Sequence, residues 1–190
     1  GNGQAAKGGG VWIDGSSGNL IGGPYSTNRN LVSCNVGAGL YLENCSGNTV
    51  QGNLIGLNVS GTAALGNTGD GVTLYNAGGN QVGGTSTWMR NIVSGNGGSG
   101  VKITGAGATG NLVQGNCIGT DTNGSLAIPN AGDGVTINSA PGNIIGGSNT
   151  GAGNLLSGNS QGGLGVKGAG ADNNVVQGNF IGTGASGLAA

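Results

Sequence analysis

The chain has 190 residues, of which 49 are Gly and 26 are Asn, whereas only 6% are charged and none is His. This glycine content disfavours helices of ordinary length, because Gly costs about 1 kcal/mol relative to Ala inside a helix. The net charge of −1, with five basic residues, argues against a nucleic-acid partner, which needs a basic surface. The absence of His removes the commonest general base and metal ligand. Apolar runs of only a few residues exclude a membrane-spanning helix.

Short apolar elements follow one another along the chain in a fixed order, and their alternating pattern predicts short strands. A Gly-apolar-x-apolar element occurs at Gly10–Ile13, Gly39–Leu42, Gly71–Leu74, Gly100–Ile103, Gly134–Ile137 and Gly163–Val166. An Asn-led element follows each of these, at Asn19–Ile21, Asn48–Val50, Asn80–Val82, Asn111–Val113, Asn143–Ile145 and Asn174–Val176. A second Asn-led element then follows, at Asn30–Val32, Asn53–Ile55, Asn91–Val93, Asn116–Ile118, Asn154–Leu156 and Asn179–Ile181. The sequence therefore predicts six rungs of three short strands each.

Longer blocks of sequence recur at a spacing of 63 residues. Gly69–Thr73 recurs as Gly132–Thr136, and Val50–Asn53 recurs as Val113–Asn116 and again as Val176–Asn179. Internal repeats on this scale are typical of solenoids. Residues 1–190 are therefore expected to form one domain of three repeats of about 63 residues, with two rungs each. The expected repeats are approximately 1–61, 62–124 and 125–190.

Stacked rungs of this kind have a simple expected chemistry. Alternate apolar side chains, such as Val11 and Ile13, point inward and form buried rows along the axis. Gly and Asn at the corners adopt the left-handed conformations that sharp turns require. Asn at one corner of every rung is expected to hydrogen-bond to the Asn of the neighbouring rung. The predicted ladder consists of Asn19, Asn48, Asn80, Asn111, Asn143 and Asn174.

The repeated Asn-x-Val-x-Gly-Asn, Gly-Asn-x-Ile-Gly-Thr and Gly-Asp-Gly-Val-Thr elements resemble the parallel β-helix repeats of secreted and surface bacterial proteins. The wider superfold is similar to that of pectate lyases and polygalacturonases, and the resemblance covers the whole chain. It implies an all-β, right-handed parallel β-helix and an extracellular or cell-surface location. Enzymes, adhesins and fibres all use this superfold, so the resemblance does not assign an activity.

The acidic residues form no cluster with a basic partner of the kind that polysaccharide lyases use. No catalytic residue, cofactor site or metal site is therefore assigned, and a lyase or hydrolase is the less favoured alternative. Asp70 and Asp133 occupy equivalent Gly-Asp-Gly turns two rungs apart, roughly 10 Å by the rung spacing. That separation is loosely compatible with two-carboxylate catalysis, but a turn role in which each carboxylate binds its own backbone is favoured. A weak Ca²⁺ site at Asp14 and Glu43, on adjacent rungs, is an alternative.

The remaining candidate residues lie on the surface or carry thiols. Trp12 and Tyr41 are outward residues of adjacent rungs that could contact a sugar ring or a neighbouring chain. The basic residues are expected to be scattered and solvated. They are Lys7, Arg29, Arg90, Lys102 and Lys167. Cys34, Cys45 and Cys117 are expected to be small buried hydrophobic residues, with a Cys34–Cys45 disulfide as the alternative.

The two ends of the chain suggest self-association, because no capping repeat is recognisable at either end. Residues 182–190 match 119–127 and 56–64, after which the chain enters another first strand, and residues 1–7 resemble that continuation. Exposed strand edges recruit other chains, so head-to-tail stacking into an open filament of identical copies is expected. The residues expected at this polymer interface are Val11, Ile13, Asn19, Ile21, Asn30, Val32, Val166, Asn174, Val176, Asn179 and Ile181.

Two other functions are retained as alternatives. The chain could be a segment of a long tandem-repeat surface adhesin, with its end rungs continued by the same polypeptide. It could also be a carbohydrate-binding or carbohydrate-active β-helix module whose partner is a cell-surface or matrix polysaccharide.

Overall fold

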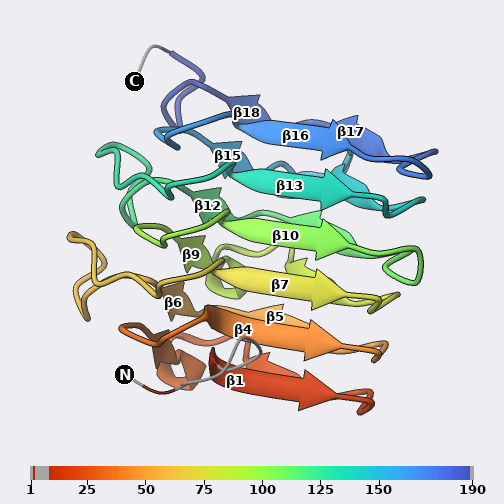
Figure 1. The fold of residues 1–190 in the computed structure, drawn as a ribbon. Helices are drawn as coiled ribbons and strands as arrows, with labels where there is room; N and C mark the ends of the chain where they lie inside the picture. Colours follow the sequence, from red (N-terminus) through yellow and green to blue (C-terminus); the bar gives the residue numbers. More distant parts are fainter. Residues whose placement is uncertain (1, 3–8, 189–190) are drawn as a thin grey trace.

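The computed structural model describes residue 2 and residues 9–188, which form a coil of stacked rungs (Figure 1). Three parallel sheets of six strands run along the coil. The first sheet contains β1 (Gly9–Asp14), β4 (Ala38–Glu43), β7 (Val72–Tyr75), β10 (Val101–Thr104), β13 (Val135–Asn138) and β16 (Leu164–Lys167). The second contains β2 (Leu20–Gly22), β5 (Thr49–Gln51), β8 (Gln81–Gly83), β11 (Leu112–Gln114), β14 (Ile144–Gly146) and β17 (Val175–Gln177). The third contains β3 (Leu31–Val32), β6 (Leu54–Ile55), β9 (Ile92–Val93), β12 (Cys117–Ile118), β15 (Leu155–Leu156) and β18 (Phe180–Ile181).

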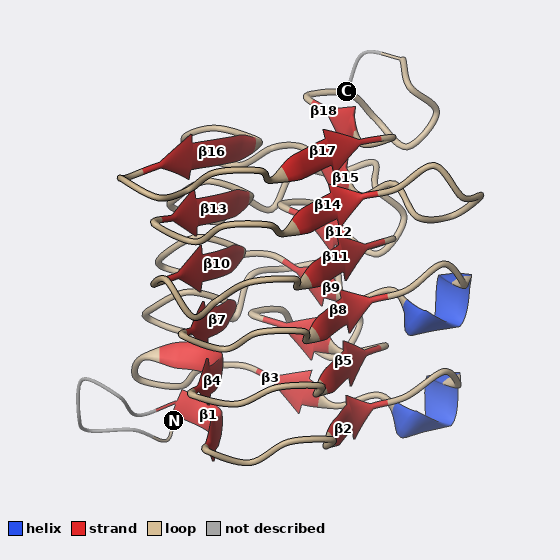
Figure 2. Ribbon diagram, turned by 90° about the vertical axis from the view of Figure 1, so that its right-hand side faces the viewer, coloured by secondary structure: helices blue, strands red, loops and turns tan. Residues whose placement is uncertain are grey.

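The predicted all-β fold with six rungs of three short strands is confirmed. Each strand pairs in register with the equivalent strand of the next rung, for example Val101 with Val135 and Ile103 with Ile137. Two short 3-10 helices, η1 (Ser26–Asn28) and η2 (Thr87–Met89), protrude between the second and third sheets on the same side of the coil (Figure 2). The continuation expected at residues 1–7 lies outside the described residues, apart from Asn2. No helix among the described residues is long and apolar enough to cross a membrane.

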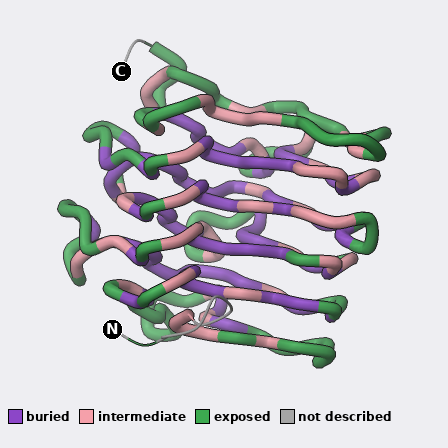
Figure 3. Tube along the Cα trace, in the orientation of Figure 1, coloured by how far each residue is buried: buried purple, intermediate pink, exposed green. Residues whose placement is uncertain are grey.

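The core is a continuous column of apolar side chains inside the coil. In β10, Val101 and Ile103 are buried whereas Lys102 and Thr104 between and after them are half-buried, which is the expected alternation. One hydrophobic cluster connects the inward residues of successive rungs. A second, smaller cluster covers the outer face of the third sheet and consists of Leu54, Leu57, Ile92, Cys117, Ile128 and Leu155. Figure 3 shows that buried segments fill the middle rungs, while exposed segments concentrate in the loops and the last rung.

Glycine and asparagine divide the corner chemistry between them. Glycine provides most of the left-handed backbone, as at Gly83, whose φ is +86° and where a Cβ would overlap the carbonyl oxygen of Gln114 in the next rung. Among the asparagines, only Asn44, Asn76 and Asn173 have positive φ in the described chain. The abundant asparagine therefore serves chiefly another purpose, which is hydrogen bonding between rungs.

Candidate functional site

The six asparagines expected to form a ladder lie in one column at the corner between the first and second sheets. Asn80, for example, donates its backbone N–H and its Nδ2–H to Oδ1 of Asn111, over 2.9 and 3.1 Å. The same pair of bonds joins Asn111 to Asn143. The four inner members, Asn48, Asn80, Asn111 and Asn143, are buried, so each bond is protected from water.

Two further columns occupy the other corners, and the sequence analysis did not identify them as ladders. One lies between the second and third sheets and contains Asn30, Asn53, Asn91, Asn116, Asn154 and Asn179. The other lies between the third and first sheets and contains Asn2, Asn35, Asn67, Asn96, Asn130 and Asn159. The regular Asn at the start of each third strand was the available signal for the second column.

The hydrogen bonds of all three columns run in one direction along the coil, because the donor always belongs to one rung and the accepting Oδ1 to the next. At the first rung, Oδ1 of Asn19 and of Asn30 accepts no bond from any described residue, although both side chains donate to the rung above. At the last rung, the backbone N–H groups of Asn174 and Asn179 have no acceptor within the described chain, whereas both side chains still donate to carbonyl groups. The two ends thus carry complementary hydrogen-bonding groups.

The last rung also exposes apolar side chains whose register partners in the rung below it are fully buried. Val176 is 42% exposed and Ile181 is 48% exposed, whereas their register partners Ile145 and Leu156 are fully buried. Val166 at the same level is similarly exposed. Their partners in the preceding rung are covered by the rung above, which these side chains lack.

The first rung is less exposed than the last. Ile21 and Val32 are only 9% and 6% exposed, and Val11 and Ile13 are half-buried. Ile21 and Val32 are part of the main hydrophobic cluster, and Val11 and Ile13 pack against it. The first rung therefore contributes hydrogen-bond acceptors and strand edges more than bare apolar surface.

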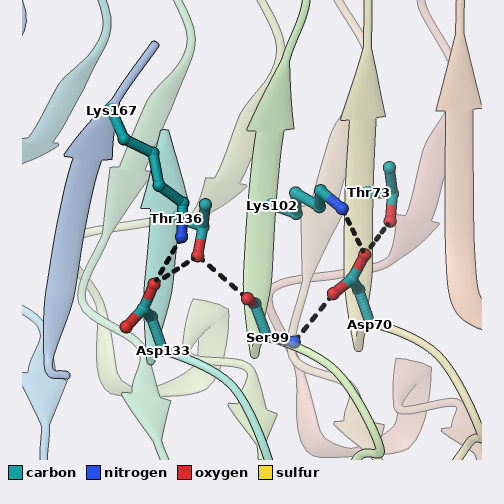
Figure 4. A network of polar contacts seen from close by, with 7 residues as sticks. All are labelled: Asp70, Thr73, Ser99, Lys102, Asp133, Thr136 and Lys167. Carbon is teal, nitrogen blue, oxygen red and sulfur yellow. Dashed lines mark hydrogen bonds and ion pairs between the residues drawn. The ribbon is translucent and has the colours of Figure 1, made fainter. Parts of the chain in front are cut away.

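Asp70 connects two rungs on the outer face of the first sheet. Its Oδ1 accepts a hydrogen bond from the backbone N–H of Ser99 over 2.7 Å, and its Oδ2 accepts one from Oγ1 of Thr73 over 3.2 Å (Figure 4). Lys102 Nζ lies 3.8 Å from Oδ2. The prediction that this carboxylate binds its own backbone was wrong, because the turn directs it to the following rung.

Asp133 repeats the arrangement, with a lysine from a different strand position. Its Oδ1 accepts from the N–H of Gly162 over 3.0 Å, and its Oδ2 accepts from Thr136 over 2.8 Å and from Lys167 Nζ over 3.4 Å. Lys102 is in register with Gly165, not with Lys167. Because a Cβ at Gly165 would lie 2.9 Å from the carboxylate, the glycine leaves room for the lysine to approach. Lys102 and Lys167 are therefore not merely solvated, contrary to expectation.

The surroundings of Asp133 keep it ionised. Burial acts to raise the pKa of its carboxyl group, but the hydrogen bonds from Thr136 and Gly162 and the ammonium of Lys167 together hold that pKa below its ordinary value. Such a group is a poor general acid at neutral pH, because it has no proton to donate. The arrangement suits a structural role in which the ionised carboxylate connects two neighbouring rungs.

Two adjoining hollows lie over this outer face. One has a volume of about 420 Å³ and is lined by residues that include Tyr41, Thr73 and Tyr75. The other, of about 270 Å³, is lined by residues that include Asp133 and Gln161. Asp70, Lys102 and Asn138 line both hollows. Trp12 is in register with Tyr41 and is more than half exposed, but it lines neither hollow.

The structure also places the predicted Ca²⁺ ligands and the cysteines, and the weak Ca²⁺ site stays a prediction. Asp14 and Glu43 are in register on adjacent strands, and the described residues include no group of three His, Cys, Asp or Glu side chains that could hold a metal ion. The three cysteines are free, so the alternative of a Cys34–Cys45 disulfide is wrong. Cys45 and Cys117 are buried as expected, but Cys34 is exposed, and its backbone has a φ of +59°.

Comparison with known proteins supports the architecture. No family model matches the sequence, and no curated protein matches it. Among solved structures, the chain is similar to a mutant of a periplasmic alginate epimerase, with a TM-score of 0.52 and 18% sequence identity. The alignment covers 88% of this chain and 36% of that one, so the chain spans little more than a third of that protein's length. At this identity the similarity shows the fold alone, which is the pectate-lyase-like parallel β-helix that the repeats resemble.

Proposed function

We propose that the chain is a structural β-solenoid subunit that extends head to tail, with the first rung of a second copy on the last rung of the first. The observation that carries this proposal is the polarity of the asparagine columns. Asn174 and Asn179 offer N–H donors at one end, and Asn19 and Asn30 offer carbonyl oxygen acceptors at the other. These are the same groups that pair between every two rungs inside the coil.

Stacking would continue all three sheets without a new kind of contact. β16, β17 and β18 would pair with β1, β2 and β3 of the next copy, since equivalent strands already pair throughout the coil. Burying the exposed halves of Val166, Val176 and Ile181 would contribute roughly 1 kcal/mol for each side chain. The contact joins two different surfaces and does not close, so it builds an open filament.

The surface chemistry favours close contact between copies. A net charge of −1 on 190 residues leaves little electrostatic repulsion to keep copies apart. We place this filament outside the cell or on its surface, as the resemblance to secreted and surface β-helix proteins implies. The periplasmic source of the structurally similar epimerase is compatible with such an exported location.

The direct test uses two lysine substitutions at neighbouring positions of β17. Val176 continues the inward column above Ile145, whereas Val175 lies above Ile144 and points outward. Sedimentation velocity of the 190-residue chain should show concentration-dependent polymers. Val176→Lys should abolish them, and Val175→Lys should leave them intact. A chain that stays monomeric at high concentration contradicts the proposal and favours end rungs covered by further repeats of one polypeptide.

A carbohydrate-binding role is the second candidate, and the hollows on the first sheet favour it. Tyr41 and Tyr75 place aromatic side chains beside Asp70, Lys102 and hydroxyl groups in one hollow of about 420 Å³, a combination suited to a sugar ring. Affinity electrophoresis in gels that contain acidic or neutral polysaccharides tests this role. Tyr41→Ala should abolish retardation, and Trp88→Ala, an exposed aromatic elsewhere, should not. A uniform absence of retardation contradicts it.

A further inference from the structure

Two equivalent arginines are anchored in the same way at the corner between the second and third sheets. Nε of Arg29 donates to the carbonyl oxygen of Gly52 over 3.0 Å, and Nε of Arg90 donates to that of Gly115 over 2.9 Å. Gly115 follows Gly52 by 63 residues, so each arginine spans to the next rung at the same repeat position. The bond fixes Nε of each guanidinium group. Arg29 and Arg90 line hollows beside the outer residues of the third sheet, Ile92 and Leu155 respectively.

The space around the two arginines differs. Beside Arg29, the hollow is only about 90 Å³, and the residues that line it include Trp88 and Thr122. Beside Arg90, a second hollow of about 320 Å³ opens toward the last rung. The cause is in the sequence, because Gly151 stands 63 residues after Trp88 and Gly153 stands 63 residues after Arg90. The large side chains of Trp88 and Arg90 in one repeat are thus replaced by glycines in the next.

The hollow beside Arg90 contains polar groups and one aromatic wall. The residues that line it include Ser148, Asn149, Phe180 and several glycines. A volume of about 320 Å³ is at the lower end of the range of roughly 300–1,000 Å³ for small-ligand pockets, so the hollow can hold more than a bare inorganic anion. The ring of Phe180 can therefore contact the body of a ligand whose charged group reaches Arg90.

Arg90 forms no ion pair with any carboxylate of the described residues, although Asp121 and Arg90 both act on the nearby Cys117 thiol. The ion pairs in the described part of the chain are Lys102–Asp70 and Lys167–Asp133, which belong to the first sheet and its preceding turns. Asp121 is held within its own loop by the N–H groups of Ser125 and Leu126, over 2.8 and 3.1 Å. Burial raises the pKa of the Cys117 thiol despite the nearby guanidinium, so the thiol stays neutral.

We propose that the hollow beside Arg90 is an oxyanion-binding site that takes a sulfate, phosphate or carboxylate group. The guanidinium of Arg90 binds the anion with N–H groups other than the Nε–H that donates to Gly115, and the side chains of Ser148 and Asn149 donate further hydrogen bonds. Phe180 packs against whatever carries the anionic group. Nothing in the proposed head-to-tail assembly requires this site, so the two proposals stand or fall separately.

Equilibrium dialysis with radiolabelled sulfate, phosphate and acetate tests the site, at constant ionic strength set with chloride. This measurement works on monomers and on polymers alike. At least one of the three anions should bind saturably with one site per chain, and the tightest of them identifies the preferred group. Arg90→Gln should weaken that binding by about tenfold or more, because one charge-assisted contact is lost.

Two matched variants separate binding from structure. Arg29→Gln removes the same anchoring bond in the filled repeat and should leave affinity within about twofold. Ser148→Trp at an exposed loop position fills the hollow while retaining Arg90, and it should also abolish binding. Absence of saturable binding for all three anions overturns the proposal, and so does an equal loss in Arg29→Gln and Arg90→Gln.

Discussion

An alanine substitution in the middle of an asparagine column should cost far more stability than one at its end. Asn111 is fully buried, and its side chain takes part in three hydrogen bonds. Oδ1 accepts two bonds from Asn80, and Nδ2 donates one to Asn143. Asn111→Ala deletes all three bonds and leaves the two donors of Asn80 buried without their acceptor.

The size of the effect follows from these counts. Three net hydrogen bonds contribute about 1 kcal/mol each, and stranded buried donors raise the cost, so a loss of about 3–5 kcal/mol in the free energy of unfolding is expected. Asn19 lies at the end of the same column, and its side chain makes a single bond, to Oδ1 of Asn48 over 2.8 Å. Asn19→Ala should therefore cost about 1 kcal/mol.

Urea titration followed by far-UV circular dichroism measures both losses, at a protein concentration below that at which copies associate. The midpoint for Asn111→Ala should fall well below that of Asn19→Ala, with similar slopes. Equal losses for the two variants would refute the claim that the buried columns hold the rungs together, because position along the column would then be irrelevant.

Three further outcomes test other parts of the structure. Gly79→Ala, at a φ of +63° with open space around it, should lower the free energy of unfolding by about 1 kcal/mol. Gly83→Ala should lower it clearly more, because its Cβ would overlap a carbonyl oxygen. Urea titration measures both losses. The folded pKa of Asp133 is below its unfolded value, so its stabilisation is complete above the unfolded pKa near 3.8 and is lost as pH falls through the folded pKa. The melting temperature of Asp133→Asn should therefore fall less than that of the wild type as pH falls below about 5. A thiol-reactive chromophore should modify Cys34 alone in the native chain and all three cysteines after denaturation, and two unreactive thiols after denaturation would indicate a disulfide.

The architecture was predictable because the interactions that create it are local and repeated. Each Gly-apolar-x-apolar element became a strand of the first sheet, and each Asn-led element became a strand beginning one residue after its asparagine, as in Leu112–Gln114 after Asn111. The Asn stays outside the strand because its side chain joins the column at the corner. The periodicity of the sequence was therefore sufficient to predict the rungs.

The contacts on the surface were not predictable, because they depend on neighbours in the next rung. Asp133 binds Lys167, which lies 34 residues away at a strand position different from that of Lys102. Only the three-dimensional register shows that Gly165 leaves room for that approach. The hollow beside Arg90 likewise results from glycines one repeat later, which a scan for charged motifs does not detect.

Electron microscopy of the purified chain tests the central claim most directly. At ~4.8 Å per rung, six rungs should produce an axial repeat of about 29 Å in long, unbranched and polar filaments. Such filaments, lost in Val176→Lys, are the predicted result. Dispersed single particles of 17.8 kDa at every concentration would contradict head-to-tail stacking.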